Sequence, residues 1–547
     1  MFTFLKRGIT NTTANTQKFI RNLVYRDREA LDPLLREEDR HEVPSKYTNV
    51  HIRMPYSQNL RVQGSASLRT ALVVLSIGAA SHFLLFLDSV VDNLLPAAMP
   101  FLLEEYTSKE KADHAWELFV SSRIYGLAVG CFIAVLLSHR NGRKLSVILG
   151  VVLDIIGVIM SLLITYIPYG VGVATAGRLL NGIGQGLVQT AGSVMLSELP
   201  PIKKRGTALA TLTMWACLGE LGGMLISLDS ILGRPSCWQW AMGFPLILLI
   251  PSLCILLKAP ESPRYLFLAN QENLARKAMA FYQNSIDGKQ SIEEILVEKQ
   301  YISKNKFDEN GNSKKSEDIG LVNYTMERLK DGRFTRPLLV ALLVQTFVHL
   351  DDWLWIPYST QIFENYGLDS GTAQISSLLM SVPQAFISIG LLGCFDNFGR
   401  RTLLIVPTIL SALFGFLAIV FGLSKSNGLP LLATLDLAVA AISGESAYAI
   451  VPELFLANDK VLATAIAGIV QNCFGGVLTS FLLTALNSRG VEKVLIPFVI
   501  MNVVYAALNY KFLPETAGKS PQEISRNYSQ NLPGSGIFTY LKLKIIS

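Results

Sequence analysis

The feature that constrains this chain most is a series of apolar runs, each about 20 residues long, between residues 71 and 513. A helix of about 20 apolar residues spans the roughly 30 Å hydrocarbon core of a bilayer. In that core every backbone N–H and C=O must be paired, and an α-helix pairs them within the segment itself. With 50% hydrophobic and only 16% charged residues, the sequence is too apolar for an ordinary soluble protein. We therefore predict an all-α membrane protein.

Twelve such runs fall into two groups of six, separated by a polar and charged segment. The expected helices cover about residues 71–99, 116–137, 145–167, 171–196, 207–232, 238–257, 337–363, 373–395, 403–423, 430–455, 462–486 and 494–513. The predicted organisation is a cytosolic N-terminal arm (1–67), a first six-helix half (68–257), a cytosolic helical linker (258–335), a second six-helix half (336–513) and a cytosolic C-terminal tail (514–547).

The two halves carry copies of the same landmarks. In each half a loop with a glycine and several cations follows the second apolar run, a glutamate ends the fourth, and a Pro-Glu pair follows the sixth. The copies lie at nearly one spacing: Gly142 and Gly399 (257 residues apart), Glu198 and Glu453 (255), and Glu261 and Glu515 (254). This spacing predicts a duplicated membrane unit with two pseudo-symmetric halves.

The cations collect in alternate loops. They occupy residues 140–144, 203–205, 258–335, 400–401, 460 and 511–519. Because Lys and Arg are enriched in cytoplasmic loops, this placement predicts that the linker and both termini are cytosolic, in a multi-pass protein of the plasma membrane. The net charge of +6 is explained by this topology, so we expect no nucleic-acid partner.

Short motifs recur in order between about residues 70 and 525. They are Gly177-Arg178, Glu198 through Arg205, Pro260 through Leu266, Tyr358 through Phe363, Asp396 through Arg401, Pro452 through Phe455, and Pro514 through Lys519. In this order the motifs resemble those of the sugar porter family of the major facilitator superfamily, which includes the facilitative glucose transporters. Organic-cation transporters share parts of the loop motifs.

The resemblance implies a twelve-helix transporter whose halves are held together on the cytosolic side by ionic contacts when it faces outward. Such contacts also follow from the residues, since cations at helix ends pair with carboxylates and with the negative ends of helices. The predicted gate residues are Arg140, Gly142, Arg143, Lys144, Glu198, Arg205, Glu261 and Arg264 in the first half, and Gly399, Arg400, Arg401, Glu453, Lys460 and Glu515 in the second.

A duplicated transporter fold places its substrate near mid-membrane, between the halves. Sugars require polar hydrogen-bonding groups together with an aromatic face. The resemblance implies that the positions contacting sugar in glucose transporters correspond here to Thr213, Gln384, Tyr448, Gln471 and Asn472.

The seventh apolar run departs from the family pattern. Counting back from Tyr358, the paired glutamines of the family become Phe347 and Val348, a glycine becomes Asp351, and an asparagine becomes Trp353. We include Trp353 among the predicted substrate contacts. Acidic groups at membrane depth also suit a cationic solute.

Five charged residues in the apolar runs are candidates for ion coupling: Asp88, Asp92, Arg178, Asp351 and Asp352. The first two lie four residues apart and so share a helix face. The resemblance implies that Asp88 and Arg178 match, approximately, a pair used by proton-coupled sugar porters. A static structural ion pair is the alternative interpretation.

The predicted function is the transport of a small polar solute, a monosaccharide or related polyol, by facilitated diffusion. The sequence contains no nucleophile constellation, metal-ligand cluster or nucleotide loop, so we expect neither an enzyme nor a cofactor. The expected partners are a small-molecule solute and the bilayer. Two alternatives stay open: a proton-coupled or organic-cation carrier using Asp88, Arg178, Asp351 and Asp352, and a solute sensor that does not transport.

Overall fold

The structure is a computed structural model of the chain. It describes residues 59–524, apart from 107, 202–203, 284, 305–320, 394, 424–427 and 520–521. The predicted N-terminal arm lies almost wholly outside the described residues, as does most of the predicted C-terminal tail.

The described chain is built of helices. The first group is α2 (Asn59–His82), α3 (Leu85–Tyr106), α4 (Lys109–Asn141), α5 (Arg143–Leu162), η2 (Leu163–Thr165), α6 (Gly170–Glu198), α7 (Arg205–Ile226), η4 (Trp238–Gly243) and α8 (Leu246–Lys258). The linker holds α9 (Pro263–Leu268), α10 (Glu272–Tyr282), α11 (Ser285–Lys304) and α12 (Leu321–Lys330). The second group is α13 (Gly332–Phe347), α14 (Leu350–Trp355), η5 (Ile356–Tyr358), α15 (Ser359–Asn365), α16 (Ser370–Leu391), η6 (Phe395–Asn397), α17 (Arg400–Leu423), α18 (Leu429–Glu453), α19 (Ala457–Arg489) and α20 (Val491–Phe512).

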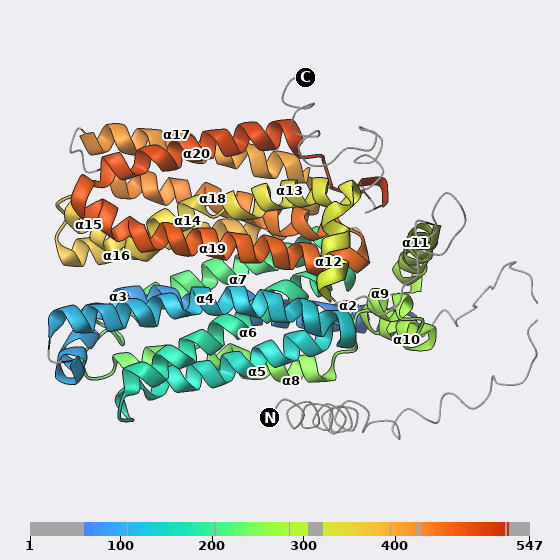
Figure 1. Cartoon of the computed structure of the whole chain (residues 1–547), viewed down its shortest axis with the longest axis horizontal. Helices are drawn as coiled ribbons and strands as arrows, with labels where there is room; N and C mark the ends of the chain where they lie inside the picture. The colour runs from blue at the N-terminus through green and yellow to red at the C-terminus, as the bar shows by residue number, and fades with distance from the viewer. Residues whose placement is uncertain are drawn as a thin grey trace, which may run out of the picture. The chain divides into compact units, whose positions relative to one another are not determined.

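The long helices of both groups lie side by side, and α9, α10 and α11 gather at one end of them (Figure 1). We call this end the linker face. The helices α5, α17 and α19 begin there, at Arg143, Arg400 and Ala457. We call the opposite end the far face.

The first and the seventh of the expected helices are interrupted, as is the sixth, which forms η4 and α8. The first apolar run, predicted as one helix over 71–99, forms α2 and α3, joined by a tight turn in which the Phe86 N–H donates to the Phe83 carbonyl at 2.9 Å. The seventh run, predicted as one helix over 337–363, forms α13, α14, η5 and α15. Its second interruption lies at Pro357, which has no N–H for the helical ladder.

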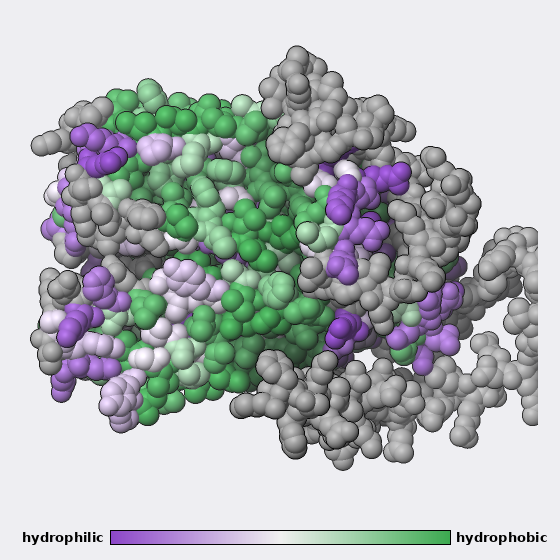
Figure 2. Space-filling view, viewed as in Figure 1, coloured by the Kyte–Doolittle hydropathy of each residue, from purple (hydrophilic) through white to green (hydrophobic). Residues whose placement is uncertain are grey.

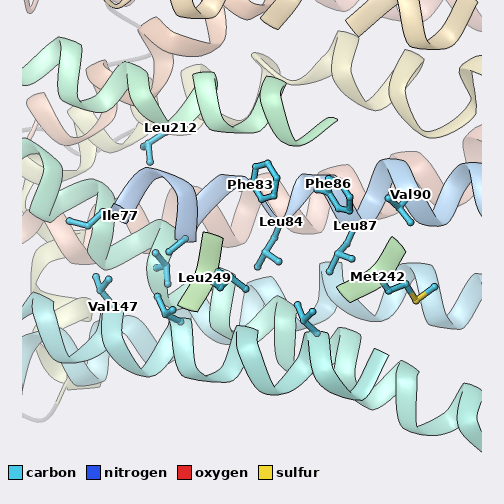
Figure 3. Packing of buried hydrophobic residues seen from close by; sticks show 14 of the residues in the cluster. Ile77, Phe83, Leu84, Phe86, Leu87, Val90, Val147, Leu212, Met242 and Leu249 are labelled. Carbon is cyan, nitrogen blue, oxygen red and sulfur yellow. The ribbon is translucent and has the colours of Figure 1, made fainter. Parts of the chain in front are cut away.

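Close packing within the first half depends on glycine. A side-chain carbon at Gly126 or Gly130 of α4 would collide with the backbone of α6, and one at Gly182 or Gly186 of α6 would collide with the backbone of α4. Small residues allow such close approach where lipid supplies no hydrophobic driving force between helices. Larger apolar side chains fill the space around α2 and α3, where Figure 3 shows Leu84 and Leu87 pointing to one side of this segment.

The surface agrees with a membrane-spanning protein. In Figure 2 apolar residues cover the middle of the helices, and polar residues gather toward the two ends. Among the described residues, 11 helical segments are long and apolar enough to cross a membrane. The twelfth, α6, has 29 residues but carries more glycine and polar side chains, including Arg178 and Gln185.

Candidate functional site

The loop between α4 and α5 turns at Gly142, whose φ of 89° lies in a region that favours glycine. The Glu261 carboxylate caps the start of α5 by accepting hydrogen bonds from the backbone N–H groups of Arg143 (3.2 Å) and Lys144 (3.1 Å). A side-chain carbon at Gly142 would collide with this carboxylate. The glycine therefore provides both the turn and the room for the cap.

The second half repeats this device at the start of α17. The Glu515 carboxylate accepts from the backbone N–H groups of Arg400 (2.9 Å) and Arg401 (3.3 Å). A side-chain carbon at Gly399 would collide with Glu515. A negative charge at a helix N-terminus is favoured by the helix dipole, so each half uses its Pro-Glu motif to fix one helix start.

A buried ionic triad lies beneath the cap of the first half. Arg143 forms an ion pair with Glu198 at 3.5 Å, and the hydroxyl of Ser262 donates to the same carboxylate at 2.5 Å. The Arg143 guanidinium also lies 4.8 Å from the ring centre of Tyr265. These contacts connect the α4–α5 loop, the end of α6 and the start of the linker.

The second half contains the equivalent triad. Arg400 lies 3.9 Å from Glu453, and the Thr516 hydroxyl donates to that carboxylate at 2.7 Å. Arg400 also pairs with Asp396, at 2.5 Å. The repeat seen in the sequence is therefore present at the level of individual contacts.

Other contacts on the linker face join the two halves. The Arg143 guanidinium donates to the carbonyl of Ala457 (3.2 Å), Lys460 donates to the Ser197 hydroxyl (3.3 Å), and the backbone N–H of Thr207 donates to Asp396 (2.9 Å). In this structure the linker face is closed by direct bonds between the first and second helix groups.

The linker helix α11 adds two carboxylates that the sequence analysis did not identify. Glu294 pairs with Arg205 and with Arg264, both at 2.8 Å. Glu298 lies 3.4 Å from Arg264 and accepts from the backbone N–H of Ala457 at 2.9 Å. Although burial raises the pKa of Glu294, the Arg264 and Arg205 guanidiniums lower that pKa to about 2. The spacing of four residues between Glu294 and Glu298, in a linker predicted to be helical, was the available sequence signal that these two carboxylates share a helix face.

Three predicted gate cations lie away from the contacts between the halves. Arg140 is exposed, and its carbonyl accepts from Tyr265 at 3.4 Å. The Lys144 ammonium donates to the carbonyl of Leu257 at 3.1 Å, within the first half. Arg401 bonds the carbonyl of Tyr510 within the second half.

The first half holds a buried charge cluster within the membrane-spanning region. Asp88 of α3 pairs with Arg178 of α6 at 2.8 Å and also with Arg123 of α4. Arg123 further bonds the side chain of Gln185. The second arginine was not among the sequence candidates. Asp92 lies in α3, but its side chain is outside the described residues.

A polar and aromatic cluster joins the halves near the interruptions in α2–α3 and α13–α14. The ring of His82 lies 4.8 Å from that of Tyr448, whose hydroxyl is 3.3 Å from Nε2 of His349. Nδ1 of His349 is 2.9 Å from Asp352, and its ring lies 6.0 Å from that of Trp353. Two predicted residues, Tyr448 and Trp353, therefore lie around His349.

A small cavity adjoins this cluster. It is lined by α6, α13, α18 and α19, with Tyr448 and Gln345 in its wall, and its volume of about 10 Å³ holds about one water molecule. Gln345 donates to the side-chain carbonyl of Gln471 at 2.9 Å. Glutamine amides beside a tyrosine suit hydroxyl groups, but a sugar requires a wider cavity than this closed state provides.

The other predicted contacts lie in the surrounding membrane-spanning helices. Gln384 donates to Glu220 of α7 at 3.2 Å, which joins the halves. Thr213 is buried on α7, near Gly444. The amide nitrogen of Asn472 is buried and has no hydrogen-bond partner among the described residues.

Asp351 lies inside the second half. Its carboxylate accepts from Ser411 and from Asn502, both at 2.7 Å, so α17 and α20 enclose it. Asp352, the next residue, points instead to His349. The two adjacent acids thus have different surroundings, which the sequence did not distinguish.

The fold and these paired gates define a two-fold repeated membrane transporter. Residues 73–528 match the family described as "Sugar (and other) transporter", and the chain belongs to that family. The family and fold predictions are thus confirmed: the fold is that of the major facilitator superfamily, with twelve membrane helices.

Individual relatives agree with this assignment. The chain is 24% identical to the galactose-proton symporter of Escherichia coli K12 over 483 residues, 85% of this chain and 96% of the relative. It is also 24% identical to the solute carrier family 2, facilitated glucose transporter member 1, of Gallus gallus, over 81% of this chain and 88% of the relative. The proton:xylose symporter XylE bound to 6-bromo-6-deoxy-D-glucose superposes with a TM-score of 0.68 at 20% identity, covering 86% of this chain and 100% of that structure.

Proposed function

We propose that this protein carries a monosaccharide or related polyol across a membrane by alternating access, as a facilitated-diffusion transporter. The observation that supports this most directly is the pair of equivalent triads at the linker face, Arg143–Glu198–Ser262 and Arg400–Glu453–Thr516. Each triad holds one half rigid, and few bonds join the halves to each other. Breaking those few bonds would open the linker face while each half keeps its own structure.

The solute would bind where the halves meet around Tyr448. That region supplies hydrogen-bonding amides, Gln345 and Gln471, and the aromatic face of Trp353. Such a combination matches the hydroxyl groups and C–H surfaces of a sugar or polyol. The similarity to a galactose-proton symporter and to a facilitated glucose transporter supports the same class of solute.

The linker face would be cytosolic, with both termini on that side, and the plasma membrane is the proposed location. The cation-rich segments at 140–144, 400–401 and in the linker all belong to this face, which agrees with the enrichment of Lys and Arg in cytoplasmic loops. The closed state described above then corresponds to an outward-facing or occluded carrier.

Proton coupling is the second candidate, and the Asp88 cluster favours it. The Asp88 carboxylate pairs with both Arg178 and Arg123, so a proton-binding step there would require the carboxylate to separate from the arginines. If helix movements during transport separate them, solute flux and proton flux become linked. The similarity to a relative named galactose-proton symporter supports this candidate.

Uptake into proteoliposomes tests both candidates. The purified protein is assayed with a panel of hexoses, polyols and organic cations, with and without an imposed pH gradient. Saturable hexose or polyol uptake that is insensitive to the gradient supports facilitated diffusion, and uptake accelerated by an inward proton gradient supports symport. Uptake of organic cations alone, or solute binding without uptake, would contradict the sugar-transporter proposal.

A further inference from the structure

A second pocket lies on the linker face, apart from the cluster around Tyr448. Its lining includes Arg205 from the first half, Arg400 and Lys460 from the second half, and Lys519 from the segment after α20. The pocket has a volume of about 20 Å³, room for one or two water molecules, and exposed Lys519 lies at its edge. Four cations from different parts of the chain therefore converge on one small space.

The arginines and the lysines differ in their partners. Arg205 is paired with Glu294, and Arg400 is paired with Asp396. Among the residues that the structure describes, neither lysine has a carboxylate within the 4.0 Å of an ion pair. The Lys460 side chain is nevertheless buried, with 1% exposure, and its ammonium is bonded to the neutral hydroxyl of Ser197. A buried ammonium with no carboxylate in direct contact is costly, and an anion placed in the pocket would contact it directly.

The pocket also contains donors that are not used. The buried Nε–H groups of Arg205 and Arg400 have no hydrogen-bond partner among the described residues. The one carboxylate in the lining, Glu453, already accepts a hydrogen bond from Thr516. Unused N–H donors beside an unpaired ammonium match an anion with several acceptor oxygens.

We propose that this pocket binds a phosphate group, either of a soluble phosphate or phosphate ester, or of a phospholipid headgroup. One or two phosphoryl oxygens would enter the pocket and accept hydrogen bonds from Lys460 and the arginine Nε–H groups, and the rest of the phosphate group would lie at the exposed edge beside Lys519. The remainder of the ligand would extend past Lys519 into solvent or along the membrane surface. A phosphate oxygen would give Lys460 the direct anionic contact that no carboxylate provides among the described residues.

Such a ligand would bind the closed linker face selectively, because the cations that hold it belong to both halves. A ligand that binds one of two states favours that state by a factor of 1 + [L]/Kd, about elevenfold when its concentration is ten times Kd. Phosphate would therefore slow opening of the linker face and act as a regulator. This effect on transport rests on the proposed function, whereas the binding itself does not.

The binding test uses the full-length protein in detergent and inorganic phosphate as the probe, titrated against chloride at constant ionic strength, with thermal unfolding as the readout. We expect saturable stabilisation by phosphate of the wild type and of Lys277→Gln, an exposed lysine of α10 that does not line the pocket. Lys460→Gln and Lys519→Gln should each weaken phosphate binding about tenfold, the loss of one charge-assisted contact. If Lys460→Gln does not fold, Lys519→Gln decides the test, because its side chain is exposed. Equal phosphate dependence in Lys519→Gln and Lys277→Gln, or stabilisation that does not saturate, would overturn the site.

The source of the phosphate is resolved with two further probes. Glycerol phosphate represents soluble esters, and nanodiscs with phosphatidic acid, compared with phosphatidylcholine alone, represent the lipid headgroup. Stabilisation by one probe that depends on Lys519 identifies the source and supports the site, and stabilisation by neither probe nor by inorganic phosphate overturns it. Sugar uptake without phosphate binding would refute the site and leave the proposed function standing. Phosphate binding in a protein that takes up no sugar would support the site and refute the proposed function.

Discussion

The two halves make the same contacts at the linker face and different contacts in the middle of the membrane. At the linker face Glu261 and Glu515 cap equivalent helices in the same way. In the middle, the first half has Asp88 between two arginines, whereas the second half has His349 beside Asp352. The difference fits the proposed function, in which each half has its own gate but the two halves together form a single solute site. The gates therefore repeat, and the centre does not.

The largest expected effect of breaking this arrangement is at the centre of the first half. Asp88→Asn removes the carboxylate that pairs with both Arg178 and Arg123 and leaves two buried cations close together. Breaking a buried ion pair from one side typically costs about 3–5 kcal/mol. We expect the free energy of unfolding to fall by about 3 kcal/mol and uptake to be lost, as measured by thermal unfolding and by proteoliposome flux.

Two variants serve as controls for Asp88→Asn. Asp351→Asn changes an acid that is bonded to neutral Ser411 and Asn502, so it should destabilise the protein less. Asp229→Asn, at an exposed position, should behave like the wild type. If Asp88→Asn were as stable as Asp229→Asn, the buried ion pairs would not hold the first half together.

The second prediction separates the two equivalent gate glycines. Gly142→Ala and Gly399→Ala both push a methyl group against a capping carboxylate, but only Gly142 has positive φ. That backbone region costs other residues about 1–3 kcal/mol. Gly142→Ala should therefore lower the free energy of unfolding by about 2 kcal/mol more than Gly399→Ala does, as measured by thermal unfolding. Gly172→Ala, where the structure leaves open space, is the matched control, and equal losses at Gly142 and Gly399 would show that φ has no part in the effect.

The third prediction concerns the linker helix, which differs from the triads in being specific to one half. Glu294→Gln keeps the shape of the side chain but removes the charge that faces Arg205 and Arg264. We expect the free energy of unfolding to fall by about 1.5–3 kcal/mol at neutral pH, since a hydrogen bond to a charged group contributes about that much. Glu293→Gln, the exposed neighbour, should have no effect.

The same variant has a pH signature. Because the pKa of Glu294 lies at about 2 in the folded protein against an ordinary value of 4.5, its stabilisation is present above pH 4.5 and is lost as the pH falls toward 2. As the pH falls from 6 to 3, the stability advantage of the wild type over Glu294→Gln should shrink, and the remainder should be lost toward pH 2. An advantage that stayed constant between pH 6 and pH 3 would contradict the assigned ion pairs.

The sequence indicated the repeated contacts at the linker face more directly than the arrangement at the centre. Helix count and repeat follow from apolar length and from the Gly and Pro-Glu motifs, and these motifs placed Gly142 and Glu261 in one set of residues without indicating that Glu261 caps a helix. The partners of Glu294, or the separation of Asp351 from Asp352, depend on how distant helices pack. A broken helix adds to the difficulty, because the turn at Phe83 and the interruption at Val348 rotate the following residues away from the face that an unbroken helix would give them.

The smallest expected effect lies in the cluster around His349. Tyr448→Phe removes the hydroxyl that bonds His349 but keeps the ring that packs against His82. In the proposed site this hydroxyl also bonds the solute. A single hydrogen bond contributes about 0.5–1.5 kcal/mol, so we expect solute affinity to weaken about three- to tenfold and the free energy of unfolding to fall by no more than about 1.5 kcal/mol. The measurement is the KM for uptake together with thermal unfolding. Tyr366→Phe, which removes a hydroxyl bonded to the Phe421 carbonyl outside this cluster, should leave KM unchanged. Equal KM values for both variants would show that the solute does not contact Tyr448. A change in KM for Tyr448→Phe alone would show that residues at the centre, and not the repeated contacts at the linker face, determine which solute binds.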